Sequence, residues 1–256
     1  MSIAVNHVVE GPENGEAVVL SGSIGSDSGM WRPQAAALTK AGYRVVRYDH
    51  RGHGRSPVPP GPYSLSDLGG DAIALLDGLG IERAHWVGLS LGGMVGMWLG
   101  EHAAERLRTL TLVCTSAQLP PAVWADRART VRAEGMGVIA EATLPRWFTP
   151  EWRAVNPELA RHFSDMIAAQ PAAGYAACCA AIETMDIAAG LPKITAPTLV
   201  ISGEEDPATP PEHGRRIAAE IPGARFEIVS PGAHLANIEA AEQIDDLIIT
   251  HLKDKW

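Results

Sequence analysis

The sequence predicts an α/β fold in which a mostly parallel sheet is flanked by helices and interrupted by one helical insertion. Short β-branched runs alternate with longer segments of helical periodicity, which is typical of parallel strands joined by crossover helices. The strands are almost continuously apolar, as expected for a sheet that is covered on both faces. The alternation stops between residues 119 and 190, where helical patterns follow one another without a strand.

Seven segments are expected as strands, and one of the helices between them has a recognisable start. From Leu65 to Leu79, apolar residues recur at helical spacing, and Ser64 with Asp67 three residues later resembles a capping box. This helix should pack on one face of the sheet. The expected strands lie at residues 3–9, 16–21, 43–48, 85–89, 109–114, 197–202 and 225–230.

The helical insertion has boundaries rich in proline and glycine, with Pro120-Pro121 at its start and Gly190-Leu191-Pro192 at its end. Because it follows a strand, it should lie at the edge of the sheet where open α/β folds bind ligands, which favours a lid. The alternative is a helical excursion that only enlarges the core. The expected organisation is a core built from residues 1–118 and 191–256, with a helical cap at residues 119–190.

Composition excludes several classes of partner. The 256 residues carry 21 basic and 30 acidic side chains, a net charge of −9, and no basic cluster, which argues against nucleic acid and anionic membranes. The three cysteines, Cys114, Cys178 and Cys179, are too few for a disulfide framework, and the adjacent pair lies in an alanine-rich segment that favours buried packing over redox sensing. Without a signal-peptide pattern or a long apolar segment, we expect a cytoplasmic protein; a homo-oligomer stays open.

The motif Gly88-Leu89-Ser90-Leu91-Gly92-Gly93 directly follows a predicted strand and precedes a helical stretch. This is the context of a nucleophile elbow, in which a sharp turn exposes the serine hydroxyl. Glycines two residues before and two residues after the serine remove Cβ atoms that would collide in such a turn. Ser90 is therefore the expected nucleophile; the alternative is that it only caps the following helix.

A serine hydroxyl needs a base, and after a nucleophile elbow the acid and the histidine follow in that order along the chain. His234 is the expected base because it lies in a loop just past a predicted strand, whereas His213 and His251 fall in predicted helices. Asp206, on an Asp-Pro turn after another strand, is the expected acid. The neighbouring Glu204 and Glu205 are expected as solvated loop charges.

The negative charge that develops on an attacked carbonyl oxygen requires two preset N–H donors. The residue after the nucleophile, Leu91, is expected to supply one, and Ile24, in the glycine-containing loop after an early strand, the other. The loop at residues 49–56 lacks the pattern of a phosphate cradle and is expected to be a fixed loop with a structural Arg51. Its histidines, His50 and His53, have no third ligand at useful spacing, so we expect no metal and no cofactor.

With these motifs in order, the chain resembles an α/β-hydrolase over its full length, which implies an eight-stranded sheet. More narrowly, it is similar to 3-oxoadipate enol-lactonases of the β-ketoadipate pathway, through RYDHRGHGRSPVPPGPYSLSDLGGD, LLDGLGIERAHWVGLSLGG, RTVRAEGM, RWFTP, GYAACCAAIE and DPATPPEHGRRIA. The resemblance implies Ser90, Asp206 and His234 as the catalytic triad, Ile24 and Leu91 as oxyanion donors, and hydrolysis of a small carboxylated enol-lactone.

The carboxylate of such a substrate should need a cation, and the predicted lid contains six arginines but no lysine. We expect Trp124, Arg127 and Trp147 to line the substrate pocket, with Arg146 as the alternative cation. The alternative places the arginines on a solvated face and the tryptophans in the interior of the lid. Two other functions remain open: a broad carboxylesterase or cofactor-free perhydrolase with the same triad, and a ligand-sensing module of this fold.

Overall fold

The computed structural model describes residues 1–254 and confirms the predicted α/β class. Seven strands form one sheet in the order β1-β3-β2-β4-β5-β6-β7, and every neighbouring pair is parallel except β1 and β3. The strands are β1 (His7–Glu10), β2 (Ala17–Ser21), β3 (Arg44–Tyr48), β4 (Ala84–Leu89), β5 (Leu107–Val113), β6 (Thr198–Gly203) and β7 (Arg225–Val229).

The sheet has seven strands where the resemblance implied eight. Two backbone donors of the segment before β1 bond to side chains, although the Asn6 carbonyl still accepts from the Asp49 N–H, directly after β3, at 2.9 Å. The Ile3 N–H donates to Asp71 at 2.7 Å, and the Asn6 N–H donates to Ser56 Oγ at 2.8 Å. The antiparallel edge is therefore the single short strand β1.

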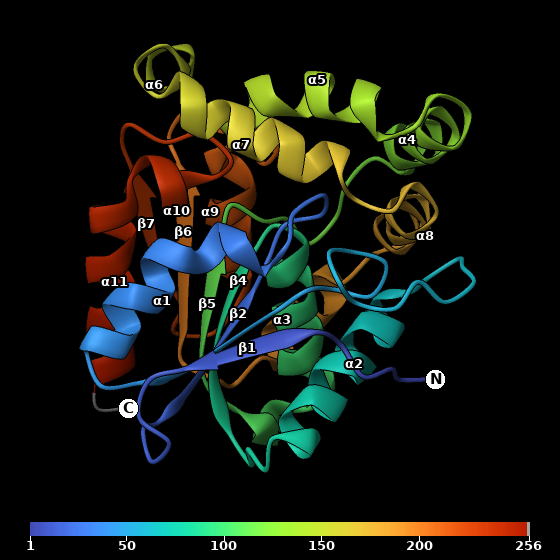
Figure 1. Ribbon diagram of the computed structural model, residues 1–256. Helices are drawn as coiled ribbons and strands as arrows, with labels where there is room; N and C mark the ends of the chain where they lie inside the picture. The colour runs from blue at the N-terminus through green and yellow to red at the C-terminus, as the bar shows by residue number, and fades with distance from the viewer. Residues whose placement is uncertain (255–256) are drawn as a thin grey trace.

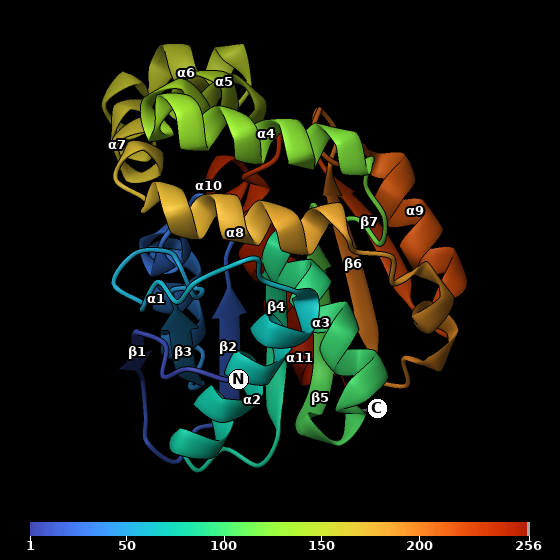
Figure 2. The ribbon, with the colours of Figure 1, turned by 90° about the vertical axis from the view of Figure 1, so that its right-hand side faces the viewer.

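Helices cover both faces of the sheet (Figures 1 and 2). On one side lie α1 (Arg32–Lys40) and α11 (Ala241–Lys253), and on the other α2 (Leu65–Gly78) and α3 (Leu91–His102). The predicted capping box is present at the start of α2: the Asp67 N–H donates to Ser64 Oγ, and the Ser64 N–H donates to the Asp67 carboxylate at 3.0 Å. The remaining helices of the core are η1 (Ser28–Trp31), η2 (Ala104–Arg106), η3 (Ala188–Lys193), α9 (Pro211–Glu220) and α10 (Ala236–Glu239).

Five α-helices lie between β5 and β6 in the chain and sit above the carboxyl ends of the parallel strands (Figures 1 and 2). They fall within the segment that lacks strand patterns in the sequence. The loops at the carboxyl ends of the parallel strands therefore lie beneath these helices. These helices are α4 (Pro121–Glu134), α5 (Met136–Trp147), α6 (Pro150–Val155), α7 (Pro157–Ala168) and α8 (Ala172–Glu183).

Helix α8 packs directly on the loop that follows β3. A Cβ atom placed on Gly52 would lie 2.6 Å from the Cα atom of Gly174, so the two backbones touch at a point where neither residue can carry a side chain. Hydrogen bonds flank this crossing: the Gly54 N–H donates to Gln170 Oε1 at 2.8 Å, and the Tyr63 N–H donates to the Ala177 carbonyl at 3.2 Å. The insertion is thereby anchored to the core through α8.

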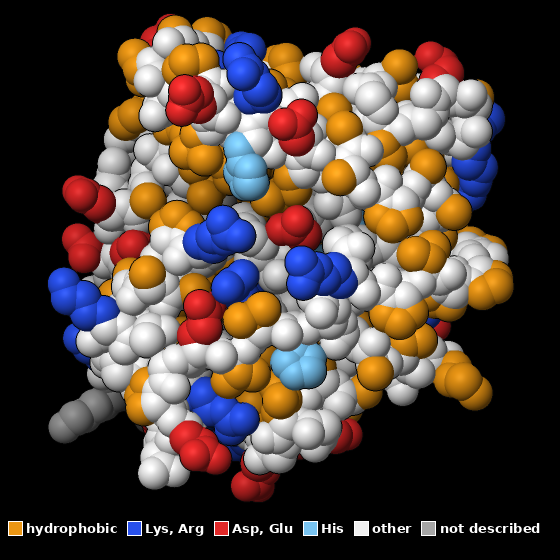
Figure 3. Space-filling model, viewed as in Figure 1, with side chains coloured by type: hydrophobic (Ala, Val, Ile, Leu, Met, Phe, Trp, Pro, Cys, Tyr) orange, Lys and Arg blue, Asp and Glu red, His pale blue; other side chains and the backbone are white. Residues whose placement is uncertain are grey.

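Acidic and basic side chains are interspersed on the face seen in Figure 3 rather than gathered by sign. Among residues 1–254, no helix combines the length and the apolar character needed to cross a bilayer.

Candidate active site

Ser90 occupies a strained turn between β4 and α3. Its φ and ψ angles are 55° and −113°, a positive φ that non-glycine residues adopt at an energetic cost. Although Ser90 stands at the N-cap position of α3, its side chain makes no capping hydrogen bond. The hydroxyl instead lines a cavity, so the interpretation of Ser90 as a helix cap has no support in the geometry.

The glycines around Ser90 are required sterically. A Cβ atom on Gly88 would overlap the carbonyl of Gly92, and one on Gly92 would overlap the carbonyl of Ser21 on β2. A Cβ atom on Gly93 would lie 2.7 Å from the side chain of Thr115. These collisions explain why the motif needs glycine at these positions, as the sequence spacing suggested. They also show that the turn packs closely against β2 and against the residues that follow β5.

Asp206 and His234 lie in the loops that follow β6 and β7, and both are buried. His234 Nδ1 is 2.9 Å from Asp206 Oδ2, so an Nδ1–H donates to the carboxylate. Thr209 completes the cradle, because its hydroxyl donates to Oδ2 at 2.7 Å and its N–H to Oδ1 at 3.0 Å. Burial would raise the pKa of Asp206, but the charge of His234 and the hydrogen bonds from His234 and Thr209 outweigh it, and the pKa lies below its ordinary value.

The other acidic and histidine candidates take different places. Glu204 and Glu205 are exposed, as expected of solvated loop charges. His251 is buried in α11 and approaches Arg225 of β7, with Nδ1 3.0 Å from Nη2. His213, in the first turn of α9, lines the same cavity as Ser90, and its Nδ1 is 2.8 Å from Ser116 Oγ. The sequence pattern places His213 in a helix and gives no reason to expect it near Ser90. Only the packing of α9 brings it to the cavity.

The two predicted oxyanion donors flank the Ser90 turn. Ile24 lines the cavity, and Leu91 is the first residue of α3. Within residues 1–254 no hydrogen bond uses the N–H of either residue, whereas the neighbouring Gly25 N–H donates to His53 and the Gly92 N–H donates to Gly22. Two unpaired backbone donors next to a serine hydroxyl can stabilise negative charge on a carbonyl oxygen.

A cavity of about 290 Å³ joins these groups to the helical insertion. Asp206 and Leu91 lie behind its wall, because neither side chain contributes to the lining. From the core, the lining includes Ser23, Ile24, Ser90, Thr209, His213 and His234. From the insertion it includes all four residues predicted to line the pocket, Trp124, Arg127, Arg146 and Trp147, together with Thr143, which the sequence did not single out.

The cavity contains two arginines and, among the described residues that line it, no acidic side chain. Arg127 donates to Thr143 Oγ1, and its guanidinium carbon lies 5.5 Å and 5.7 Å from the ring centroids of Trp124 and Tyr175. Its buried Nε has no hydrogen-bond partner in the described part of the chain. Burial and then the charge of Arg127 lower the pKa of Arg146. An anion between the two guanidinium groups would relieve this repulsion.

The chain is similar in sequence and in fold to several known proteins. A family model described as alpha/beta hydrolase fold matches residues 16–241. The chain is 40% identical to 3-oxoadipate enol-lactonase 1 of Acinetobacter baylyi over 92% of its own length and 88% of that protein. The crystal structure of the enol-lactonase from Burkholderia xenovorans LB400 is similar with a TM-score of 0.96 and 40% identity, covering 98% of this chain and 96% of that one. A thermophilic esterase from Thermogutta terrifontis with malate bound has a TM-score of 0.92 and 30% identity, covering 97% and 93% of the two chains.

Proposed function

Since the chain belongs to the α/β-hydrolase fold family, we propose that it is a carboxylic ester hydrolase that opens 3-oxoadipate enol-lactone to 3-oxoadipate in the β-ketoadipate pathway. The main structural support for this substrate is a pair of arginines, Arg127 and Arg146, that line the cavity above Ser90 without an acidic side chain beside them in the lining. The enol-lactonase relatives support the same substrate, which bears one carboxylate beside the lactone ring.

In the acylation step, Ser90 Oγ attacks the lactone carbonyl carbon while His234 takes the hydroxyl proton. Asp206 holds the imidazole with its proton on Nδ1, which leaves Nε2 as the base, and stabilises the imidazolium that forms. The tetrahedral oxyanion accepts hydrogen bonds from the N–H groups of Ile24 and Leu91. His234, Asp206 and the two N–H groups therefore stabilise mainly the charges that develop in the transition state.

Collapse of the tetrahedral intermediate breaks the ring C–O bond, and His234 gives its proton to the departing enolate oxygen. An enolate is a better leaving group than an alkoxide, and it stays tethered because it belongs to the acyl chain. A water molecule, deprotonated by His234, then attacks the acyl-enzyme ester. The bond between the acyl carbon and Ser90 Oγ breaks, His234 returns its proton to Oγ, and the acid product leaves. The enol product tautomerises to 3-oxoadipate, and no cofactor is required.

Residues 119–190 act in this proposal as a lid that supplies the specificity of the site. Arg127 and Arg146 bind the free carboxylate of the substrate, and Trp124 and Trp147 form apolar walls beside them. Guanidinium groups suit a planar carboxylate because they can donate two parallel hydrogen bonds. The lid would also exclude bulk water from the acyl-enzyme except for the hydrolytic molecule.

Replacement of Arg127 or Arg146 by methionine should raise KM for the enol-lactone about 10- to 100-fold, the range expected for one hydrogen bond to a charged group. Turnover of an uncharged aryl acetate should change less than about threefold, because that substrate lacks the carboxylate. Steady-state kinetics of both variants on both substrates measure the difference. Arg161→Met, at an exposed position of α7, is the matched control. An unchanged KM for the lactone in both variants contradicts the proposed role.

The proposed substrate is tested by comparing kcat/KM on 3-oxoadipate enol-lactone with kcat/KM on aryl acetates and with the rate of peracid formation. A preference for the enol-lactone is expected. A preference for neutral esters identifies a broad carboxylesterase, and efficient peracid formation a perhydrolase. Negligible turnover of every ester, together with ligand-dependent capture of a protein partner, identifies a ligand-sensing module.

A further inference from the structure

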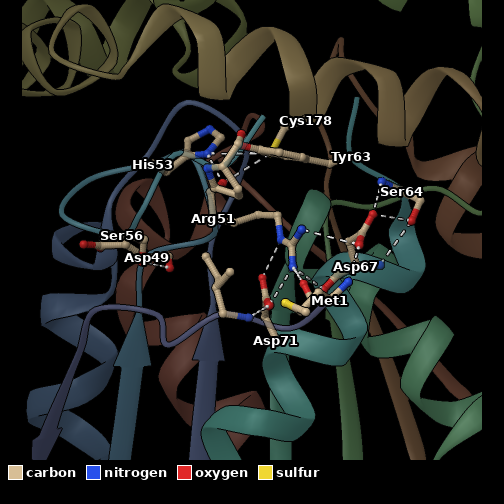
Figure 4. A network of polar contacts seen from close by, with 12 residues as sticks. Met1, Asp49, Arg51, His53, Ser56, Tyr63, Ser64, Asp67, Asp71 and Cys178 are labelled. Atoms are coloured by element: carbon tan, nitrogen blue, oxygen red, sulfur yellow. Dashed lines mark hydrogen bonds and ion pairs between the residues drawn. The ribbon is translucent and has the colours of Figure 1, made fainter. Parts of the chain in front are cut away.

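Two histidines hold the loop that carries Ile24, one at each end of the segment from Gly22 to Gly25. His50 Nε2 is 3.1 Å from the Gly22 carbonyl, and the Gly25 N–H donates to His53 Nε2 at 3.0 Å. Both histidines belong to the loop that follows β3. Figure 4 shows this loop, with His53 next to Arg51 and Cys178.

The partners of each ring assign its tautomer. His53 Nε2 faces an N–H and must accept, so the proton is on Nδ1, which lies 3.3 Å from the Arg51 carbonyl and 3.8 Å from Cys178 Sγ. His50 Nε2 faces the Gly22 carbonyl and must donate, so its Nδ1 carries a lone pair. That Nδ1 is buried without a partner in the described chain, which is tolerated better by a lone pair than by an N–H. One imidazole therefore donates to the loop and the other accepts from it.

Both imidazoles are neutral at pH 7. Burial is the main cause in each case: it lowers the pKa of His50 to about 4, and burial together with the neighbouring His50 lowers the pKa of His53 to about 4. The charge of Asp49 acts in the opposite direction on both rings without restoring their ordinary pKa. The other titratable groups beside them are Tyr48, Tyr175 and Cys178.

Two carbonyl groups of the loop accept further hydrogen bonds. The Gly22 carbonyl accepts a second hydrogen bond from the Gly92 N–H at 3.0 Å, which ties the loop to the turn of Ser90. The Ser23 carbonyl accepts from the N–H and from the hydroxyl of Ser26, at 3.2 Å and 2.7 Å. In the described chain this leaves the Ile24 N–H without a hydrogen bond, at the midpoint of a segment that is fixed on both sides.

We propose that His50 and His53 are positioning residues of the oxyanion hole, which hold the segment from Gly22 to Gly25 so that the Ile24 N–H is already directed at the oxyanion before the substrate arrives. The inference rests on the proposed ester hydrolysis but not on the identity of the ester. Neither imidazole touches the substrate. Their effect is on the transition state, because a preset donor is worth more there than one that must reorient.

The test compares His53→Gln with His53→Asn, two neutral substitutions that differ in reach. The Oε1 of glutamine can take the place of Nε2 and accept from the Gly25 N–H, whereas asparagine is too short. With p-nitrophenyl acetate, His53→Asn should lower kcat by about 100-fold at nearly unchanged KM, the loss expected when a group that stabilises the transition state is misplaced by about 1 Å. His53→Gln should stay within about fivefold of the wild type by the same reasoning.

A second readout separates positioning from general destabilisation. A trifluoromethyl ketone that forms a tetrahedral adduct with Ser90 should bind more weakly to His53→Asn by about the same factor as kcat falls, and almost normally to His53→Gln. His85→Asn is the control, because His85 is also buried but lies at the start of β4 and bonds to Thr109 Oγ1 at 2.9 Å. It should lower Tm without changing kcat.

Unchanged kcat and inhibitor affinity in His53→Asn overturn the inference. Equal losses in His53→Asn and His53→Gln, with equal falls in Tm, overturn it as well, because they indicate a purely structural role. A wild-type protein that turns over p-nitrophenyl acetate but not the enol-lactone contradicts the proposed substrate alone, so the two failures are distinguishable.

Discussion

Ser90→Ala should lower kcat for ester hydrolysis by about 10⁴- to 10⁶-fold, the loss seen when the nucleophile of a serine triad is removed. The reason is that the variant has no atom at this turn that can form the acyl-enzyme. His234 and Asp206 could still activate water, and the Ile24 and Leu91 N–H groups could still stabilise an oxyanion, so a small residual rate is expected. Folding should be little affected, since Ser90 Oγ makes no hydrogen bond in the described chain.

Steady-state hydrolysis of 3-oxoadipate enol-lactone and of p-nitrophenyl acetate measures the loss. A fluorophosphonate probe, followed by mass spectrometry of the labelled peptide, should modify Ser90 in the wild type and leave the variant unlabelled. Ser66→Ala, at an exposed position of α2, is the control and should retain full activity and labelling. Undiminished hydrolysis by Ser90→Ala would show that another group attacks the ester.

Arg51→Met should reduce the free energy of unfolding by about 3–5 kcal/mol, as expected when one partner of a buried ion pair is removed. Arg51 donates to both carboxylate oxygens of Asp71 at 2.6 Å and 2.7 Å, and the two residues are only 4% and 1% exposed (Figure 4). Asp67 lies 3.4 Å from the same guanidinium group. The variant leaves the carboxylate of Asp71 buried without its cation, and this uncompensated charge is the main cost.

Urea unfolding followed by circular dichroism gives the change in free energy. Arg216→Met is the matched control, because Arg216 pairs with Glu220 at 2.9 Å on the surface of α9, where an ion pair is worth less than about 1 kcal/mol. The double variant Arg51→Met, Asp71→Leu removes both buried charges and should recover part of the stability. A loss below about 1 kcal/mol in Arg51→Met would mean that water or another group compensates Asp71.

Much of the fold and of the site could be predicted because their signals are local in the chain. Gly88 marks the turn of Ser90 because a Cβ atom there would overlap the Gly92 carbonyl four residues later, and the capping box at Ser64 marks the start of α2 through contacts of the same short range. Asp206 and His234 each follow a strand, and the carboxyl ends of parallel strands meet at one edge of a sheet. Adjacency of the two side chains therefore follows from topology.

What the sequence could not supply depends on contacts between distant segments. Thr209 is an unremarkable residue in a loop until its hydroxyl is seen to donate to Asp206. His213 looks like an ordinary helical residue until α9 brings it to the cavity. The sequence predicts a fixed loop at residues 49–56 with a structural Arg51, and Arg51 is indeed held by Asp71. Nothing in the sequence indicates that His53 accepts a hydrogen bond from the Gly25 N–H. The seven strands that the residue pattern predicts are all present, whereas the eighth strand that the resemblance implies is absent from residues 1–254.

The contact between Gly52 and Gly174 has a consequence for recombination with relatives. The two glycines come from the core and from the insertion, and each backbone occupies the space that the other's Cβ would need. A chimaera that takes only the 119–190 segment from another α/β-hydrolase keeps this close crossing only if the donor also has glycine at the position of Gly174. An exchange that transfers the segments around Gly52 and Gly174 together preserves this contact. An exchange that transfers only one of them preserves it only when both parents have glycine there, whatever the chemistry of the transplanted pocket.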